Sequence, residues 1–475
     1  MNAYLPASAQ RRTKNFGAEL RELARLGGPI AFVQVGLNAL SFVDACFLGH
    51  YTSSALPAMA LGNTLVWLVL ATGMGFLMAV DPLLSQAIGA REPHAVTRQL
   101  LRGAVLAFAL SIPAALSLLP APLWLDWLGQ KADLIPGAAT YARISSLGVL
   151  PFFGFSLLRT FLSAHSRIAP QILVIVVGNL LNALLDWMWI FGRIGCSEHG
   201  IAGSAWATVV GRWFMFLMLI ALSWRDLAPH VKQLASATVR RSVCKLRPLQ
   251  NLFRLGAPIG GQLALEMGVF ALTLLLIGHM DDALQANTDG GPRLGGHQVA
   301  LQLASLTYML PLGISMAAAV RVGWATGRGD AAAVLRTTVT SMCAGGFVMT
   351  FAMALFLFLP TQLTSLLTDD LSISRFAVAL IPIAGVFQIF DGLQVTAIGC
   401  LRGMGDMRTP FWANVIGYWV LALPLGCWLS MPFGLNLGPQ GLWWGLTAGL
   451  FLVAFAMLFV LRARCKTTTS RLHID

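Results

Sequence analysis

The sequence predicts an all-α membrane protein with twelve transmembrane helices, in two six-helix lobes related by a pseudo-two-fold axis along the membrane normal. Three observations support this fold class. First, 57% of the 475 residues are hydrophobic and only 11% are charged, whereas about a quarter of a soluble domain is charged. Second, the apolar residues form twelve segments of membrane-spanning length. Third, the second half of the chain repeats landmarks of the first half.

Each predicted span contains about 20 mostly apolar residues, the length that a helix needs to cross a hydrocarbon core of roughly 30 Å. The longest polar segment lies between the sixth and seventh spans, so it divides the chain into six plus six spans. The spans are expected at residues 28–49, 58–80, 100–119, 138–160, 168–190, 202–223, 257–279, 298–320, 335–359, 376–398, 410–431 and 440–462.

These limits also define five parts of the chain. The two lobes contain six spans each, and the other three parts are polar. The parts are an N-terminal segment at 1–27, a first lobe at 28–223, a linker at 224–256, a second lobe at 257–462 and a C-terminal tail at 463–475.

Positive charges gather in every second loop, and cytoplasmic loops carry an excess of Lys and Arg. We therefore expect a multi-pass membrane protein with both termini in the cytoplasm. This topology also accounts for the net charge of +12, so the expected partner is the lipid bilayer and not a nucleic acid. The basic loops contain Arg98, Arg167, Arg240, Arg241, Lys245, Arg328, Arg408 and Arg464, and the opposite loops contain Asp126, Asp133, Glu198 and Asp370.

The two halves share a framework of proline and glycine. The motif Arg-Leu-Gly-x-Pro-Ile occupies residues 25–30 and returns at residues 254–259, and its prolines, Pro29 and Pro258, are candidate hinges. Because each half has an even number of spans, both halves have the same orientation, and an axis along the membrane normal relates them. Glycines fourteen residues apart also recur, as Gly75 with Gly89 and as Gly313 with Gly327.

In the first half, Asp44 lies in the first span, Asn182 and Asp186 lie on one face of the fifth span, and Thr208 lies in the sixth. A charged group in mid-membrane costs roughly 2.5 to 3.5 kcal/mol, so such residues face a bundle interior or water and usually serve a function. Two carboxylates beside an amide and a hydroxyl can share one proton. Alternatively, Asn182 and Asp186 only hold helices together through hydrogen bonds. Arg212 is the one basic residue that we place deep in a span.

The second half carries different acids. Glu266 lies in the seventh span, Asp391 in the tenth, and Gln298 opens the eighth. Two acids from different helices can hold a monovalent cation such as Na⁺ or exchange protons. Pairing with a buried base is the alternative, but we predict no such base in this half. No cysteine or histidine has metal-ligand spacing, so we expect no cofactor apart from the coupling ion.

Several segments resemble the multidrug and toxic compound extrusion family, and more specifically its NorM-like bacterial branch. They come from both halves of the chain. They are LARLGGPIAFVQ and VDACFLGH in the first span, GxxxNxxxDW around Asp186, LFRLGAPIGGQLALEMGVFAL around Glu266, HQVALQLASLTYMLPLGISMAAAVRVGWATGRGD across the eighth span and FQIFDGLQVTAIGCLRGMGDMRTP around Asp391.

The resemblance implies export of organic cations and drugs in exchange for H⁺ or Na⁺. One departure from the family pattern weakens the expectation of sodium coupling, because Phe387 occupies a position where a hydroxyl-bearing aromatic residue can assist the cation in relatives. The residues that the resemblance implies are Asp44, Asn182, Asp186 and Thr208 for a proton-linked site in the N-lobe, and Glu266 and Asp391 for a cation site in the C-lobe.

We therefore expect a secondary antiporter that works as a monomer. An enzyme is not expected, because the sequence has no Walker A motif and no catalytic constellation. Lipophilic organic cations and drugs are the expected cargo, since the excess of charge inside the spans is acidic. A flippase for lipid-linked oligosaccharide precursors is the alternative, but it would favour cationic residues that hold phosphates.

Overall fold

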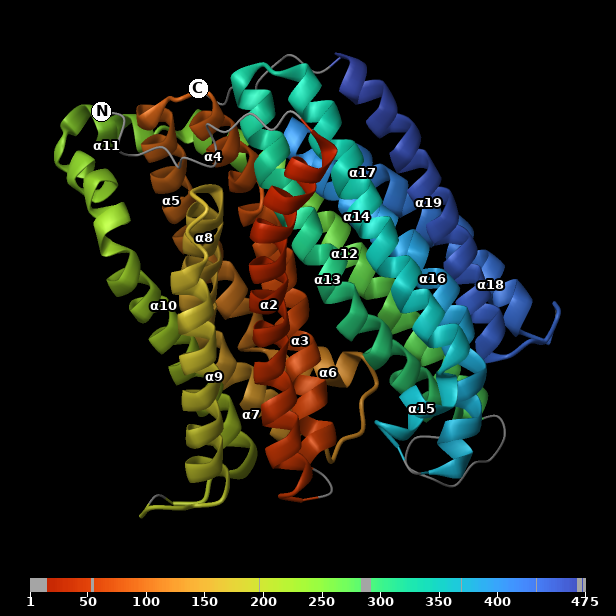
Figure 1. The fold of residues 1–475 in the computed structure, drawn as a ribbon. Helices are drawn as coiled ribbons and strands as arrows, with labels where there is room; N and C mark the ends of the chain where they lie inside the picture. The colour runs from red at the N-terminus through yellow and green to blue at the C-terminus, as the bar shows by residue number, and fades with distance from the viewer. Residues whose placement is uncertain are drawn as a thin grey trace. The chain divides into compact units, whose positions relative to one another are not determined.

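The computed structural model of the protein describes residues 15–52, 55–195, 197–282, 292–368, 370–432, 434–467 and 472. The elements in these ranges are all helices, and no strand occurs among them. The described residues form twelve spans that are long and apolar enough to cross a membrane. The predicted fold class and the number of spans are therefore confirmed, and Figure 1 shows the helices in chain order.

Three of the first six spans consist of more than one helical segment. A short helix, α6 (Ala121–Trp127), precedes the fourth span. The six spans are α2 (Phe16–Gly49), α3 (Ala55–Leu77) with α4 (Val80–Gly89), α5 (Pro93–Leu118), α7 (Ile135–Ser145) with η2 (Ser146–Gly148) and α8 (Val149–Ala164), α9 (Ala169–Ile190), and α10 (Gly200–Lys232) followed by η3 (Gln233–Ala235).

The other six spans include one with a π-helical stretch, η4, in its middle. Two short helices, α11 (Ala237–Val243) and α15 (Pro360–Ser365), lie outside the spans. The six spans are α12 (Leu246–Asp282), α13 (Pro292–Arg328), α14 (Ala331–Phe358), α16 (Leu371–Met404), α17 (Arg408–Asn414) with η4 (Val415–Ala422) and α18 (Leu423–Ser430), and α19 (Pro439–Thr467).

Several helices extend well beyond their predicted limits. Helix α10 continues to Lys232 and α12 begins at Leu246, so helical structure occupies much of the polar segment 224–256. Hydropathy marks only the part of a helix that suits lipid, whereas the backbone hydrogen bonds continue through polar residues. Buried polar contacts hold this segment, because His230 and Thr97 share a hydrogen bond of 2.7 Å and Arg102 donates to the Ser242 carbonyl at 3.1 Å.

The described helices divide into two compact units. The first unit contains Phe32–Gly260, and the second contains the described residues of Arg11–Ala31 and Gly261–Arg471. Helix α2 therefore begins in the second unit and ends in the first, and α12 does the reverse. In the first unit α9 lies beside α10, and in the second α13 and α14 lie beside α16 (Figure 1).

Small residues allow the starts of α2 and α12 to pack closely in these units. A Cβ atom on Gly75 of α3 would lie 2.5 Å from Cα of Gly260 in α12. A Cβ atom on Gly313 of α13 would lie 2.5 Å from Cβ of Ala31 in α2. Gly75 and Gly313 are corresponding landmarks of the sequence repeat, so each unit contains one version of the same close helix crossing.

A buried ion pair fixes the start of α2 inside the second unit. Arg321 of α13 donates from Nε to Glu19 Oε1 at 2.8 Å, and the Thr337 hydroxyl of α14 donates to the same oxygen at 2.7 Å. The exposed fractions of Glu19 and Arg321 are only 2% and 8%. Because both charges are enclosed, the removal of either one would leave the other buried without its counter-charge.

The glycine crossing predicts a stability difference between two positions of α12. A Cβ atom on Gly260 would lie 2.9 Å from both the Thr72 carbonyl oxygen and the Phe76 ring of α3, whereas a Cβ atom on Gly278 meets nothing within 4 Å. Leucine should therefore be crowded at position 260 and tolerated at position 278. Overpacking of this kind costs about 1–3 kcal/mol. We expect Gly260→Leu to lower the thermal unfolding temperature of the purified protein and Gly278→Leu to leave it nearly unchanged. Equal unfolding temperatures for the two variants would contradict the crossing.

The ion pair makes a second prediction about stability. Arg321→Leu removes the arginine that pairs with the buried Glu19 carboxylate, and breaking a buried ion pair costs about 3–5 kcal/mol. Replacing both residues by leucine removes both charges, so the double variant should recover much of this loss. The measurement is again thermal unfolding, with the exposed Arg21→Leu on α2 as control. A single variant as stable as this control would show that the pair does not anchor α2.

Candidate functional site

The four site residues predicted in the first half come together inside the first unit. Asp44 of α2 lies against α10, where the Thr208 hydroxyl donates to Asp44 Oδ2 at 2.7 Å. Asn182 and Asp186 of α9 face the same region, and both lie within interaction range of Asp44. Asp44 is only 1% exposed, and the two α9 residues are fully buried. The prediction that these residues are neighbours is consistent with this geometry.

Close helix packing brings α9 and α10 to this position. A Cβ atom on Gly178 of α9 would lie 2.5 Å from Met215, and one on Gly203 of α10 would lie 2.6 Å from the Trp189 carbonyl oxygen. Glycine at both positions lets the two backbones approach, as small residues commonly do between membrane helices. Asn182 and Asp186 are four residues apart and therefore lie on one face of α9.

Contacts beyond the end of α2 hold it against the loop that precedes α10. The Tyr51 hydroxyl donates to Glu198 Oε1 at 2.7 Å, and the Tyr51 ring lies edge-on to Phe191 with centroids 6.1 Å apart. The hydrogen bond to the Glu198 carboxylate raises the pKa of Tyr51. Because these contacts lie less than three turns from Asp44 in sequence, they help to fix its distance from Thr208.

Most polar atoms of this cluster have no hydrogen-bond partner. Among the described residues, no hydrogen bond of standard geometry reaches Asp44 Oδ1, either carboxylate oxygen of Asp186, or the amide group of Asn182. An unsatisfied buried polar group costs roughly 1–3 kcal/mol, and more when it is charged. Such a cluster is suited to bind something small that supplies the missing interactions, such as a proton, a water molecule or a cation.

The structure adds two residues to the first cluster. Tyr141 of α7 is almost fully buried and interacts electrostatically with Asp44 and Asp186. Arg212 of α10 interacts electrostatically with Asp44 and Tyr141. The sequence singled out Arg212 as a basic residue inside a span, but its spacing gave no partner. Tyr141 carried no signal, because tyrosine is common in apolar helices.

Arg212 is not the only arginine buried within a span, which corrects the expectation from sequence. Arg159 of α8 is buried and bonds to the Gln34 side-chain oxygen of α2, and Arg321 and Arg402 are also buried. These arginines lie near the predicted span ends, where the helices continue past the apolar segment. Arg321 and Arg402 lie just beyond the predicted spans that end at residues 320 and 398, and Arg159 lies one residue before the predicted end at residue 160.

In the second unit, Glu266 of α12 and Asp391 of α16 lie within electrostatic range of each other. Two tyrosines, Tyr308 of α13 and Tyr418 of η4, lie within range of both acids. The carboxylates of Glu266 and Asp391 have neither a hydrogen bond nor an ion pair with any residue that the structure describes. This cluster therefore combines two acids with two phenol groups.

Polar contacts between helices position this second cluster. Gln388, one turn before Asp391, donates to the Ala304 carbonyl of α13 at 3.1 Å. Gln394, one turn after Asp391, donates to Asn414 at 3.1 Å and accepts from the Tyr418 hydroxyl at 3.4 Å. Tyr418 lies in the π-helical stretch, and such stretches are frequent at functional sites.

Gln298 does not join the second cluster. Its side chain is exposed, whereas the preceding His297 points inward, is fully buried and accepts from Trp443 at 3.1 Å. Consecutive residues of a helix differ by about 100° in direction, so only one of the two can face the interior. The sequence pattern could not distinguish between two adjacent polar residues.

Phe387 also has a packing role in the structure. It is buried and lies edge-on to Trp443, with ring centroids 5.7 Å apart. Among the described residues, no group of three or more His, Cys, Asp or Glu side chains could hold a metal ion. Any cation at Glu266 and Asp391 would therefore need hydroxyl, amide or carbonyl oxygens as further ligands.

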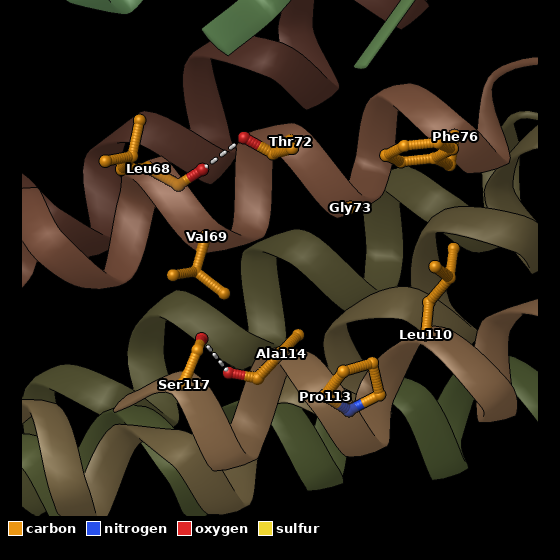
Figure 2. Close-up of a pocket in the computed structure, with 9 residues that line it drawn as sticks. All are labelled: Leu68, Val69, Thr72, Gly73, Phe76, Leu110, Pro113, Ala114 and Ser117. Carbon is orange, nitrogen blue, oxygen red and sulfur yellow. Dashed lines mark hydrogen bonds between the residues drawn. The ribbon is translucent and has the colours of Figure 1, made fainter. Parts of the chain in front are cut away.

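Two cavities in the described part of the chain are separate from both clusters. In the first unit, a cavity of about 280 Å³ lies between α3 and α5, and Figure 2 shows its mostly apolar lining around Gly73 and Pro113. In the second unit, a cavity of about 490 Å³ lies near Arg293, Phe376 and Gln440. Neither cavity is lined by any of the predicted acids.

Comparison with known proteins places the chain in a family. A family model for MatE matches residues 29–188 and 258–428. The probable multidrug resistance protein NorM of Mesorhizobium japonicum is 32% identical over 447 residues, which are 93% of each chain. The protein of the same name from Burkholderia mallei is 34% identical over 449 residues, which are 92% of this chain and 91% of the relative.

Solved structures support the same fold. The eukaryotic MATE transporter AtDTX14 has a TM-score of 0.80 at 20% identity, covering 96% of this chain and 99% of its own. An outward-facing MATE family transporter of the MOP superfamily has a TM-score of 0.81 at 16% identity, covering 97% and 100%. The family model matches both halves, and the relatives extend over nearly the whole chain. The chain therefore belongs to the MatE family, in its NorM-like bacterial branch.

Proposed function

We propose that this protein is a secondary antiporter that exports lipophilic organic cations and drugs in exchange for H⁺ or Na⁺ by alternating access. The observation that carries the proposal is the presence of two acid pairs within the spans, Asp44 with Asp186 and Glu266 with Asp391. Their carboxylates have no ion-pair partner among the described residues. The related proteins named as multidrug resistance proteins support the choice of cargo.

In the first unit, Asp44 and Asp186 are proposed to take up and release a proton. Two carboxylates at close range do not both ionise readily, so one proton is shared by the pair. Thr208 already donates to one oxygen of Asp44. The amide of Asn182 has no partner among the described residues, so it can rotate to donate to whichever oxygen carries the charge.

In the second unit, Glu266 and Asp391 are proposed to bind the coupling ion, either H⁺ or Na⁺. Phe387 offers no hydroxyl group, but Tyr308 and Tyr418 lie within electrostatic range of both acids. A phenol oxygen from either tyrosine would be a suitable ligand for Na⁺, which prefers oxygen donors. The absence of a hydroxyl at position 387 therefore does not by itself exclude sodium coupling.

Ion binding would drive transport by changing the relative stability of two conformations. A ligand shifts such an equilibrium only through its different affinities for the two states. Neutralising a buried acid removes a large desolvation cost, so the ion favours the state in which the acid is most enclosed. Drug bound near the acids would be released outward in that step.

We also propose the arrangement in the membrane. Lobes at 28–223 and 257–462, joined by the linker at 224–256, would lie in the bacterial inner membrane as a monomer, with Pro29 and Pro258 as hinges. Both termini would be cytoplasmic, because the basic loops all fall on one side. The predicted terminal segments 1–27 and 463–475 lie partly outside the described residues.

The acids of the second unit give a direct test of the function. Asp391→Asn and Glu266→Gln each keep the shape of the side chain but remove its ability to ionise. We expect ethidium uptake into inverted vesicles, driven by an imposed H⁺ or Na⁺ gradient, to fall to the level of vesicles without the protein. The control is Asp126→Asn, since Asp126 is exposed on α6.

The two gradients identify the coupling ion, because only the coupled gradient should drive uptake by the unaltered protein. Full uptake by both acid variants would contradict the proposed role of the second unit. If no drug moves under either gradient, but a fluorescent lipid-linked oligosaccharide crosses the bilayer, the flippase function would be favoured instead.

The proposed orientation predicts which cysteines react from outside. Cys244 is exposed and lies between α11 and α12. Asp133 is exposed between α6 and α7. In a background without other cysteines, a membrane-impermeant maleimide should label Asp133→Cys in intact cells but label Cys244 only in inverted vesicles. The reverse pattern would overturn the orientation.

A further inference from the structure

Arg212 is a buried cation that lies beside the acid pair of the first unit. It is one helical turn after Thr208, whose hydroxyl bonds to Asp44, and residues four apart lie on the same face of a helix. Its exposed fraction is 8%. It interacts electrostatically with Asp44 without forming an ion pair, and its Nη1 atom has no hydrogen-bond partner among the described residues.

The surrounding residues form a packing site for this guanidinium group. The carbon Cζ of Arg212 lies 5.6 Å from the centre of the Phe152 ring, which suits a cation–π interaction. The η2 turn ends at Gly148, where a Cβ atom would lie 3.1 Å from Cδ and 3.2 Å from Nη1 of Arg212. Any larger residue at position 148 would crowd the guanidinium group, so the break between α7 and α8 accommodates the arginine.

The polar groups around Arg212 and the acid pair come from four elements. They include two acids, one phenol and one guanidinium group, and otherwise only neutral polar side chains. They are Asp44 from α2, Tyr141 from α7, Asn182 and Asp186 from α9, and Ser204, Thr208 and Arg212 from α10. With both acids ionised, the cluster therefore carries a net charge of −1, and one proton makes it neutral.

We propose that Arg212 is a permanent counter-cation of the Asp44 and Asp186 pair, so that this cluster exchanges protons and does not bind Na⁺. The proposal rests on the proposed antiport and specifies the ion of its first site. A tethered positive charge stabilises ionised acids at close range. It also repels a second cation, and one added proton already brings the cluster to neutrality. Arg212 does not itself exchange the proton. It acts as a positioning residue, because its charge lowers the affinity of the two acids for that proton.

Transport as a function of pH tests this role. In sodium-free proteoliposomes, Arg212→Met should move the pH of half-maximal ethidium transport upward by about one unit, because loss of the positive charge favours the proton-bound pair. Arg212→Lys keeps the charge and should largely restore the profile of the unaltered protein. Arg225→Met, at an exposed position on the same helix, is the matched control and should have no effect.

Binding of ²²Na⁺ to purified protein gives a second measurement that does not depend on transport. In a Glu266→Gln and Asp391→Asn background, the protein with Arg212 should bind no ²²Na⁺ in excess of the background level. Addition of Arg212→Met should create binding that Asp44→Asn then abolishes. Gel filtration establishes that each variant is folded before it is measured.

Three results would overturn the proposal. In the first, the pH dependence of ethidium transport is the same for Arg212→Met, Arg212→Lys and the unaltered protein. In the second, the protein that retains Arg212 binds ²²Na⁺ in a way that requires Asp44. In the third, Arg212→Met produces no gain of ²²Na⁺ binding. Failure of the antiport itself looks different, because the unaltered protein would then move no drug under either gradient. The sodium-binding comparison would remain informative in that case.

Discussion

The enclosure of ionisable side chains within apolar helices is the constraint on which the structure depends. A charged group exposed to lipid costs several kcal/mol, so each acid and each arginine in a span must be surrounded by other helices. Close surrounding requires that backbones approach, and the glycines at positions 75, 178, 203 and 313 permit this approach. The many glycines of the spans therefore allow the helices to enclose the few charged side chains.

The buried acids fall into two groups that differ in how they are satisfied. Glu19 accepts hydrogen bonds from an arginine and a threonine, which suits a fixed structural contact. Asp186, Glu266 and Asp391 have no such bond within the described part of the chain. A bound ion can therefore supply the favourable interactions that these carboxylate oxygens do not make within the fold. Asp44 is intermediate, because one of its oxygens accepts from Thr208 and the other has no bond of this kind among the described residues. Glu19 is therefore held by the fold, whereas the acids of the two clusters retain oxygens that can bind an ion.

Much of the fold could be predicted from sequence, because membrane helices are recognised by local composition. The twelve spans and the shared face of Asn182 and Asp186 follow from segment length and helical period alone. Contacts between distant segments could not be predicted in this way. Glu19 bonds to a residue 302 positions away, and no local pattern encodes that contact. The same limit applies to Tyr141 and Tyr418, and to the choice between His297 and Gln298, which depends on a rotation of about 100° around one helix.

The sharing of α2 and α12 between the two units has a consequence for biosynthesis. The start of α2 is made first, but the helix that supplies Arg321 follows about three hundred residues later. The first unit likewise lacks Gly260 until the start of α12 has left the ribosome. The first unit can therefore pack once Gly260 has been made, whereas the start of α2 must wait in the membrane until α13 and α14 follow. The two units are thus completed one after the other, and a chain cut between α10 and α12 would produce two fragments that each lack part of their own packing.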